Sequence, residues 1–380
     1  MQFKDLKRQY RVLRTDMDKA ILDVAASGAY IMGPQVQELE RELADYVGTR
    51  HCISCASGTD ALTLALKAWG IRRGDAVFVP DFTFFASAEA VSLEGATPVF
   101  VDVDRETFSI DPADLENKIE ATIRKGESVP KVIITVDLFG LPANYHAIRR
   151  IADNHGLLIL EDGAQGFGGA LDGKRNCSFG DISTTSFFPS KPLGCYGDGG
   201  ACFTDNDEWA VLIDSYRMHG KGSSKYENVR IGMNSRLDAI QASILRVKLK
   251  AFAEELAVVN RAAAEYTARL AGIVETPVVP DGSLSSWAQY TVKLNNKTER
   301  DGLQAYLERQ GIPSMVYYPT PMRRQTAYVN RGLPESDCTV ADRLCETVLS
   351  LPIHPYIALE EIDEVCSSIK AFLCREKRIK

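Results

Sequence analysis

Between residue 34 and about residue 205, helical spacing of apolar residues alternates with short runs that are apolar throughout. Val36, Leu39, Leu43 and Val47 recur every three or four residues, which predicts a helix that begins at Pro34. The expected strands are the runs at 52–55, 76–80, 97–103, 131–140, 157–162, 182–188 and 199–204. Several are apolar on both faces, as is typical of a sheet that helices cover on both sides. The pattern therefore predicts an α/β domain with a mostly parallel sheet.

After residue 205 the pattern changes twice. A polar segment with several glycines runs from His219 to Arg236, and loops of this length within a compact domain are usually functional or disordered. The stretch 237–272 has no proline and predicts one long helix or two. The remainder predicts strands at 287–294 and 314–319, a helix at 299–311 and one or two final helices. We therefore predict a large α/β domain over residues 1–245 and a smaller α+β domain over residues 246–380.

The composition is that of an ordinary globular chain, with 380 residues, of which 45% are hydrophobic and 25% charged. The net charge of −7 argues against general nucleic-acid binding, because phosphate backbones favour a basic surface. The charged start and the lack of an apolar run of about 18 residues predict neither a signal peptide nor a membrane span. The nine cysteines, an odd number, fit reduced thiols. We expect a cytoplasmic protein with no nucleic-acid or membrane partner.

Cys52 and Cys55 form a CxxC motif, which is one half of many zinc sites. No second pair lies near them in the sequence, and His51 beside them is poorly spaced as a third ligand. Buried core cysteines are therefore favoured over a metal site, and we predict no metal.

The segment SFFPSKPLGCYGDGG, residues 186–200, places a single basic residue, Lys191, in an unusual setting. Pro189 and Pro192 restrict the backbone on both sides, and four glycines permit close approach or positive φ. A catalytic lysine must be partly neutral, so its pKa must fall from ~10.4 toward ~7–8 through burial or neighbouring cations. This segment alone is compatible with a positioned catalytic amine and with a loop lysine beside a tight turn.

The segment ASGTD, residues 56–60, joins a predicted strand to a predicted helix. Backbone N–H groups at such a helix start, together with the Ser57 and Thr59 hydroxyls, can bind an anion. The alternative is a helix cap with nothing bound. The segment lacks the glycine-lysine pattern of a Walker loop, and no GxGxxG follows a strand, which argues against a nicotinamide dehydrogenase.

Two further segments follow predicted strands. LLILEDGAQ ends an apolar run with Glu161, Asp162 and Gln165, where ligands of open α/β sheets bind. Asp162 could pair with a protonated ring nitrogen, and the alternative is a helix cap or a structural salt bridge. DFTFFAS offers an aromatic ring that could stack on a flat ligand, although such residues are more often core. Together the four segments meet the needs of pyridoxal 5′-phosphate (PLP): a phosphate anchor, a stacking ring, an acid for the ring nitrogen and an amine for the aldehyde.

These segments resemble the DegT/DnrJ/EryC/StrS sugar aminotransferases over nearly the whole chain. The resemblance is carried by the ordered set SGTDAL, DFTFFAS, EDGAQ, SFFPSKPLGCYGDGGA and RIGMNSRLDAIQA. It implies the aspartate-aminotransferase-like fold of the fold-type-I PLP enzymes. That fold has a large domain with a mixed, mostly parallel sheet and a smaller C-terminal α+β domain.

The resemblance also implies roles around the cofactor. Lys191 falls on the family's Schiff-base lysine, and Asp162 on the partner of the pyridine nitrogen. Gln165 matches a contact to the ring hydroxyl, and Phe84 the aromatic residue that stacks on the ring. The phosphate ligands implied by the same comparison are Gly58, Thr59 and Ser186.

Other implied roles concern the substrate and a second subunit. Asn234 matches a residue that reaches the phosphate from the neighbouring subunit, which implies a homodimer with shared active sites. Arg236 falls on a residue that faces the carboxylate of a uronic acid substrate, and Tyr318 on another sugar contact. Tyr317 stands where the similar enzymes tend to have histidine, so we expect this position to influence how the sugar is held.

The resemblance implies transfer of an amino group from L-glutamate to a keto-sugar nucleotide, with release of 2-oxoglutarate. The similar enzymes aminate UDP-2-acetamido-2-deoxy-3-keto-glucuronate at carbon 3, for cell-surface polysaccharides such as O-antigen and lipopolysaccharide. The alternatives are 4-amination of a UDP- or dTDP-4-keto-6-deoxy sugar and a non-catalytic regulator that binds PLP or a nucleotide sugar. A PLP-dependent sugar dehydratase of the same group is disfavoured, because those enzymes replace the lysine with histidine.

Overall fold

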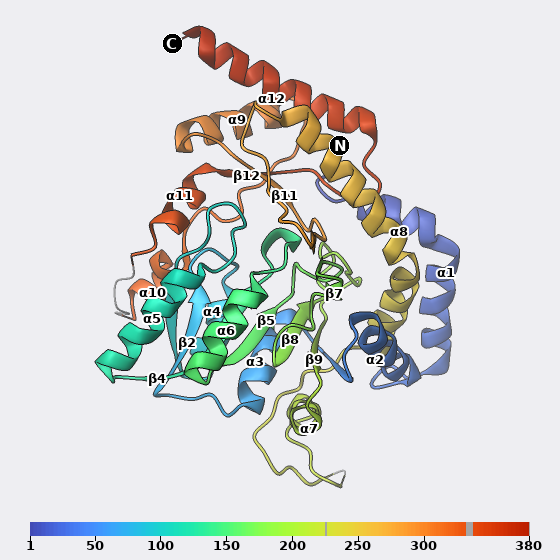
Figure 1. Ribbon diagram of the computed structural model, residues 1–380. Coiled ribbons are helices and arrows are strands. Elements are labelled where there is room, and N and C mark those ends of the chain that lie inside the picture. The colour runs from blue at the N-terminus through green and yellow to red at the C-terminus, as the bar shows by residue number, and fades with distance from the viewer. Residues whose placement is uncertain (225, 332–336, 380) are drawn as a thin grey trace.

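The computed structural model describes residues 1–224, 226–331 and 337–379, and its centre is a seven-stranded mixed sheet (Figure 1). The strand order is β1-β9-β8-β5-β4-β2-β3, and β9 alone runs antiparallel to its neighbours in this sheet. The strands are β1 (His51–Cys55), β2 (Asp75–Pro80), β3 (Thr97–Val101), β4 (Val129–Val136), β5 (Leu158–Asp162), β8 (Ile182–Ser186) and β9 (Gly200–Thr204). The expected α/β fold with a mixed, mostly parallel sheet is confirmed.

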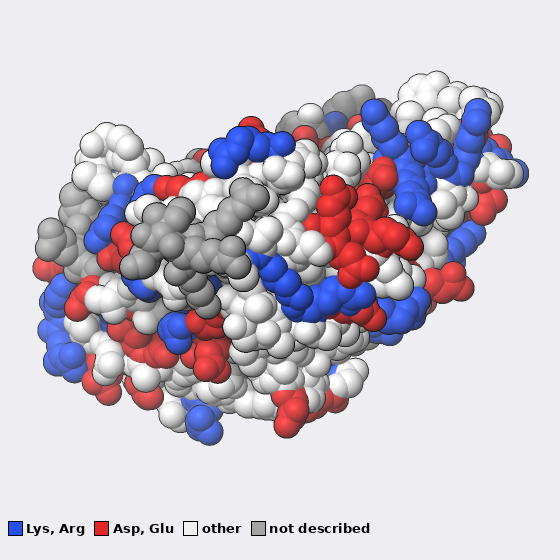
Figure 2. All heavy atoms as spheres, turned by 90° about the horizontal axis from the view of Figure 1, so that it is seen from above, with Lys and Arg blue, Asp and Glu red and all other residues white. Residues whose placement is uncertain are grey.

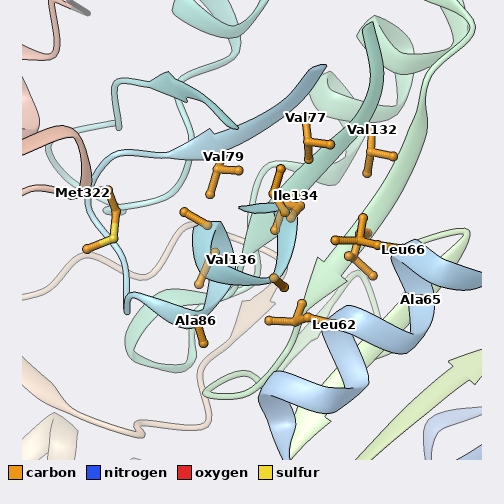
Figure 3. Close-up of a cluster of buried hydrophobic side chains, with 14 of the residues drawn as sticks. Leu62, Ala65, Leu66, Val77, Val79, Ala86, Val132, Ile134, Val136 and Met322 are labelled. Atoms are coloured by element: carbon orange, nitrogen blue, oxygen red, sulfur yellow. The ribbon is translucent and has the colours of Figure 1, made fainter. Parts of the chain in front are cut away.

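Helices cover both faces of this sheet, which explains why its strands are apolar throughout. On one face, Leu62 and Leu66 of α3 point toward Val132 and Ile134 of β4 (Figure 3). On the other face, Ile133 and its neighbours pack against α5 and α6. The helices of this region are α1 (Leu6–Ser27), α2 (Pro34–Val47), α3 (Gly58–Ala68), α4 (Ala86–Leu93), α5 (Pro112–Lys125), η1 (Leu138–Gly140), α6 (Tyr145–His155) and α7 (Asp207–Arg217).

The C-terminal part has a separate core of its own. The single long helix α8 (Ala239–Leu270) leads into it, and a two-stranded antiparallel sheet pairs β11 (Tyr290–Lys293) with β12 (Val348–Leu351). The remaining elements are β6 (Ala170–Leu171), β7 (Lys174–Arg175), β10 (Ser283–Leu284), α9 (Lys297–Arg309), η2 (Met322–Arg324), α10 (Thr326–Val329), α11 (Thr339–Thr347) and α12 (Leu359–Ile379). The division at residues 245 and 246 stays a prediction; both positions lie within α8.

Two elements differ from the sequence-based expectation. The predicted strand at 314–319 is absent: Met315 alone pairs with Ser350, and the chain then turns at Tyr317. Prolines at 313, 319 and 321 flank this segment, and a proline has no N–H to donate to a sheet. Helix α1 was not predicted, because only Gln9, Met17 and Val24 of its 22 residues are buried, which is too sparse to produce a helical period.

The surface seen from above in Figure 2 carries Lys and Arg side chains in groups that alternate with groups of Asp and Glu. Within the described part of the chain, no helix is long and apolar enough to span a membrane.

Candidate active site

The site is a cavity of about 450 Å³ at the carboxyl ends of the parallel strands. Its walls come from the segments that follow β1, β2, β5 and β8, together with residues of the C-terminal part. Ligands of open α/β sheets bind at this edge, because the loops that leave parallel strands converge there. The predicted residues that line it are Gly58, Thr59, Phe84, Asp162, Gln165, Ser186, Lys191, Tyr317 and Tyr318.

One end of the cavity is formed by the start of α3. Ser57 caps this helix, because its hydroxyl accepts a 3.1 Å hydrogen bond from the Asp60 N–H. The first N–H groups of a helix have no partner within the helix, and the helix dipole makes this end positive. Gly58 lies against Ser186, so that a Cβ added at Gly58 would be 2.6 Å from the Ser186 Cβ. Backbone N–H groups and two hydroxyls, those of Thr59 and Ser186, thus border a space suited to a phosphate.

Asp162 lies at the end of β5, and its side chain is almost fully buried. The carboxylate accepts hydrogen bonds from the Ser87 hydroxyl at 2.7 Å and from the Ala164 N–H at 3.2 Å. Burial raises the pKa of Asp162, while Ser87, Lys191 and the Ala164 N–H lower it. A buried carboxylate with these hydrogen bonds and a nearby amine favours a cationic partner, such as a protonated ring nitrogen.

Lys191 lies in a turn that is closed by hydrogen bonds between its own backbone groups. The Phe187 N–H donates to the Gly199 carbonyl at 2.7 Å, and the Lys191 N–H donates to the Phe188 carbonyl at 2.9 Å. Burial lowers the pKa of the Lys191 amine, and the negative charge of Asp162 raises it. The lowered pKa favours a neutral, nucleophilic amine, and the same electrostatic coupling places Lys191 near Asp162.

Gln165 connects the floor of the cavity to a tyrosine on the opposite wall. Its amide nitrogen donates a 3.0 Å hydrogen bond to the Tyr318 hydroxyl, and its amide oxygen accepts one of 2.6 Å from the Phe139 N–H. Phe84 has 55% of its side chain exposed, and its ring centre is 6.2 Å from that of Tyr318, at an interplanar angle of 41°. These rings leave an aromatic surface beside the space between Lys191 and the phosphate end.

Asn234 and Arg236 are not part of the cavity lining. Both lie in the segment between α7 and α8, part of which projects from the body of the molecule (Figure 1), whereas Ser235 between them is buried and donates a 2.6 Å hydrogen bond to the Asp60 carboxylate. Asn234 is exposed and pairs with Met218 in an isolated antiparallel bridge, and Arg236 is half-buried. The structure therefore brings nine of the eleven predicted residues together in one chain and leaves these two apart.

The structure adds residues that sequence reasoning missed. Ser87 bonds Asp162 and is itself within 3.2 Å of the Thr83 hydroxyl, although DFTFFAS was considered only for its aromatic rings. Gln289 lines the cavity, and its side-chain oxygen is buried without a hydrogen-bond partner. Nothing in the sequence marks Gln289, because a single polar residue before a strand is common.

The two cysteines of the CxxC motif lie in the core. Cys52 and Cys55 are buried with free thiols, and among the described residues no group of three or more His, Cys, Asp or Glu side chains is arranged to hold a metal ion.

Comparisons with known proteins agree with this geometry. The family described as the DegT/DnrJ/EryC1/StrS aminotransferase family matches residues 12–370. A Pseudomonas aeruginosa protein named UDP-2-acetamido-2-deoxy-3-oxo-D-glucuronate aminotransferase is 43% identical over 370 residues, which cover 97% of this chain and 99% of that protein.

Two solved structures are also similar. An aminotransferase of this family from Brucella abortus is 47% identical with a TM-score of 0.95, and the match covers 98% of this chain and 99% of that one. The PLP form of a putative sugar aminotransferase from Streptococcus pneumoniae, Spr1654, is 26% identical with a TM-score of 0.88, over 95% of this chain and 96% of that one.

Proposed function

Because the chain belongs to the DegT/DnrJ/EryC1/StrS aminotransferase family, we propose that it transfers the amino group of L-glutamate to a keto-sugar nucleotide. The chain is a PLP-dependent sugar aminotransferase. The observation that carries the proposed roles is the Lys191 amine beside the buried Asp162 carboxylate, in a cavity whose far end is a helix start. The acceptor that we propose is UDP-2-acetamido-2-deoxy-3-keto-glucuronate, aminated at carbon 3, as the name of the Pseudomonas relative suggests.

The residues of the cavity fit PLP. Gly58 leaves a space beside Ser186 that any side chain would fill, and the phosphate is held there by Gly58, Thr59 and Ser186. Asp162 provides the carboxylate for the ring nitrogen, and Lys191 the amine for the aldehyde. When bound, PLP supplies an electron sink for the carbon that carries the amino group.

The side chains of this chain then have separate tasks. The Asp162 carboxylate, oriented by Ser87, keeps a proton on the ring nitrogen. When PLP is bound, the Lys191 amine would hold its aldehyde, and the same amine, when free, would remove the proton from the donor's α-carbon. Its lowered pKa suits both tasks, because a fully charged ammonium could neither anchor the aldehyde nor accept a proton. In the second half of the reaction Lys191 delivers a proton to the carbon of the sugar that is being aminated.

We also propose that the enzyme is a homodimer in which Asn234 and Arg236 complete the partner's cavity. Asn234 is exposed and lies outside its own cavity, and nearby Ile231 has 92% of its side chain exposed on the same projecting loop. An apolar side chain that exposed on a projecting loop is explained by a second subunit that covers it. Arg236 would then face the sugar carboxylate, which an arginine binds through two parallel hydrogen bonds.

Two experiments test these roles. Borohydride reduction of the cofactor-loaded protein should leave the mass of reduced PLP attached to the peptide that contains Lys191. An unmodified Lys191 peptide from fully loaded protein would contradict the assignment. The reverse half-reaction identifies the sugar: protein, 2-oxoglutarate and one amino-sugar nucleotide at a time are incubated, and glutamate is measured. We expect glutamate from the UDP-linked 3-amino-glucuronate.

The second candidate is 4-amination of a UDP- or dTDP-4-keto-6-deoxy sugar. The observation that favours it is Tyr317, which lines the cavity at a position where uronate-specific enzymes tend to have histidine. A 6-deoxy sugar has no carboxylate, so a phenol is a suitable neighbour for its methyl group. Glutamate formation from a 4-amino-6-deoxy sugar nucleotide, with none from the 3-amino-glucuronate, would establish this reaction instead.

A further inference from the structure

Lys248 is a buried amine of α8 that packs against the outside of the Lys191 turn. Its side chain is 2% exposed. The amine donates a 2.6 Å hydrogen bond to the Gly194 carbonyl and lies 4.7 Å from the centre of the Tyr196 ring. Burial lowers the pKa of Lys248 to about 8, while the negative charge of Glu255 raises it. Lysine is almost never this deeply buried without a specific partner, and here the partner is the turn itself.

Gly194 and Lys191 belong to the same tightly packed stretch of backbone. A Cβ added at Gly194 would be 2.5 Å from the Pro189 carbonyl oxygen, so this glycine lies directly on the residues that precede Lys191. The Cys195 N–H donates to the Phe187 carbonyl at 2.8 Å, which closes the turn beneath Lys191. A shift of the Gly194 carbonyl should therefore also shift the backbone of Lys191.

Helix α8 holds the turn at a second point. The Gln241 side-chain oxygen accepts a 2.8 Å hydrogen bond from the Tyr196 N–H. Gln241 and Lys248 are seven residues apart, which is two helical turns, so they lie on the same face of α8. One rigid helix thus contacts both Gly194 and Tyr196.

We propose that Lys248 is a positioning residue for Lys191: it holds the turn through the Gly194 carbonyl and so fixes the place from which the Lys191 amine reaches the cofactor. The proposal rests on the role assigned to Lys191 in the proposed function. Lys248 is not among the residues that line the cavity. We therefore expect Lys248 to influence how PLP is positioned in the cavity. This influence can be measured by cofactor binding, without turnover.

The test compares Lys248→Met, Lys248→Arg and the control Lys250→Met, an exposed lysine two residues along the same helix. Affinity for added PLP and the visible circular dichroism per bound PLP are measured. Lys248→Met should bind PLP about 10-fold more weakly, the effect of one charge-assisted hydrogen bond, and with a smaller dichroic signal. Lys248→Arg keeps a long side chain with an N–H donor for the Gly194 carbonyl, so PLP affinity and the dichroic signal should return close to their wild-type values. Lys250→Met should match the wild type.

Wild-type affinity and dichroism in Lys248→Met would overturn the proposal, and so would a loss that Lys248→Arg does not restore. Should Lys248→Met not fold, Gln241→Leu replaces it; this variant removes only the contact to Tyr196 and should weaken PLP binding in the same direction. An unchanged Gln241→Leu would then overturn the proposal. Borohydride labelling of the wild-type Lys191 peptide distinguishes a failure of this proposal from a failure of the proposed function. If the peptide is not labelled, the proposed function fails, whatever the Lys248 variants show.

Discussion

The turn that carries Lys191 and the loop that carries Asn234 and Arg236 are both irregular, yet they are built in opposite ways. The turn is closed by the bonds from Phe187 to Gly199 and from Cys195 to Phe187, and α8 contacts it from outside. The loop bonds to α7 at its base, where the Met233 N–H donates to the Tyr216 carbonyl at 2.7 Å, and its two arms bond each other beyond that point. Ile231 is nevertheless almost fully exposed. The turn is packed within its own chain. In the proposed dimer, the loop would contribute Asn234 and Arg236 to the partner's cavity, so that part of the substrate site would lie between two subunits.

The largest effect that tests this comparison comes from the turn. Lys191→Ala removes the amine that anchors the cofactor and moves the proton, so steady-state turnover should fall by about 10³-fold or more. The variant should still bind PLP, because the phosphate contacts at Gly58 and Ser186 remain. Turnover is measured by coupled glutamate consumption and bound PLP by absorbance after dialysis. Turnover at the wild-type rate would show that the turn does not carry the catalytic amine.

A smaller effect is expected from the carboxylate that faces this amine. Asp162→Asn keeps the shape and an acceptor for Ser87 but removes the charge, so kcat/KM should fall by about 100-fold, as when a preorganised electrostatic partner is lost. The control is Asp153→Asn, an exposed carboxylate on α6, which should leave kcat/KM unchanged. Equal kinetics for Asp162→Asn and the wild type would remove Asp162 from the site.

The same contrast explains what could be predicted from the sequence. The strands and the residues that follow them were predictable, because burial on both faces makes a run apolar and because Ser57–Thr59, Asp162 and Ser186 stand directly at strand ends. Residues such as Ser87, Gln289 and Lys248 were not, because their roles arise from contacts between segments far apart in the chain. Lys248 is 54 residues from Gly194, and in the sequence nothing distinguishes it from Lys250, the other lysine of α8.

The loop is tested by mixing two inactive subunits. If sites are shared, a dimer of one Lys191→Ala chain and one Arg236→Ala chain has one site with both defects and one with none. Two variants that are each nearly inactive should then recover about a quarter of the wild-type activity when unfolded and refolded together in equal amounts. Measured kcat after co-refolding, against each variant refolded alone, checks this. Absence of recovery in a mixture shown by mass spectrometry to contain mixed dimers would place Arg236 in its own chain's site.

The buried Lys248 amine of α8, which contacts the turn, also predicts an effect of pH on stability that the exposed residues of the loop should not show. The pKa of Lys248 is about 8 in the folded protein and 10.5 without burial, so the unfolded chain binds more protons between these values. The unfolding free energy of the apo wild type, relative to Lys248→Met, should therefore rise from pH 8 to pH 10.5, by at most about 3 kcal/mol. Denaturant unfolding at each pH measures it.

Other groups near Lys248 do not disturb this comparison. The pKa of Cys195 is raised by burial to about 11, and that of Tyr196 to about 12, but both residues are present in the two proteins and their titrations largely cancel in the difference. A difference that is flat between pH 8 and pH 10.5 would mean that Lys248 is not held at a lowered pKa.

The smallest effect is expected at Ile231, on the same loop. Ile231→Ser changes an exposed side chain, so the unfolding free energy of the single chain should change by less than about 0.5 kcal/mol. In a dimer that covers Ile231, however, the same change removes apolar contact area, so the variant should dissociate at higher protein concentration in sedimentation velocity runs. Ile123→Ser on α5, which also replaces an exposed isoleucine, is the matched control and should sediment as the wild type does. Identical dissociation of all three proteins would mean that Ile231 stays in solvent. A partner other than a second copy of this chain would then be needed to explain the exposed Ile231 side chain.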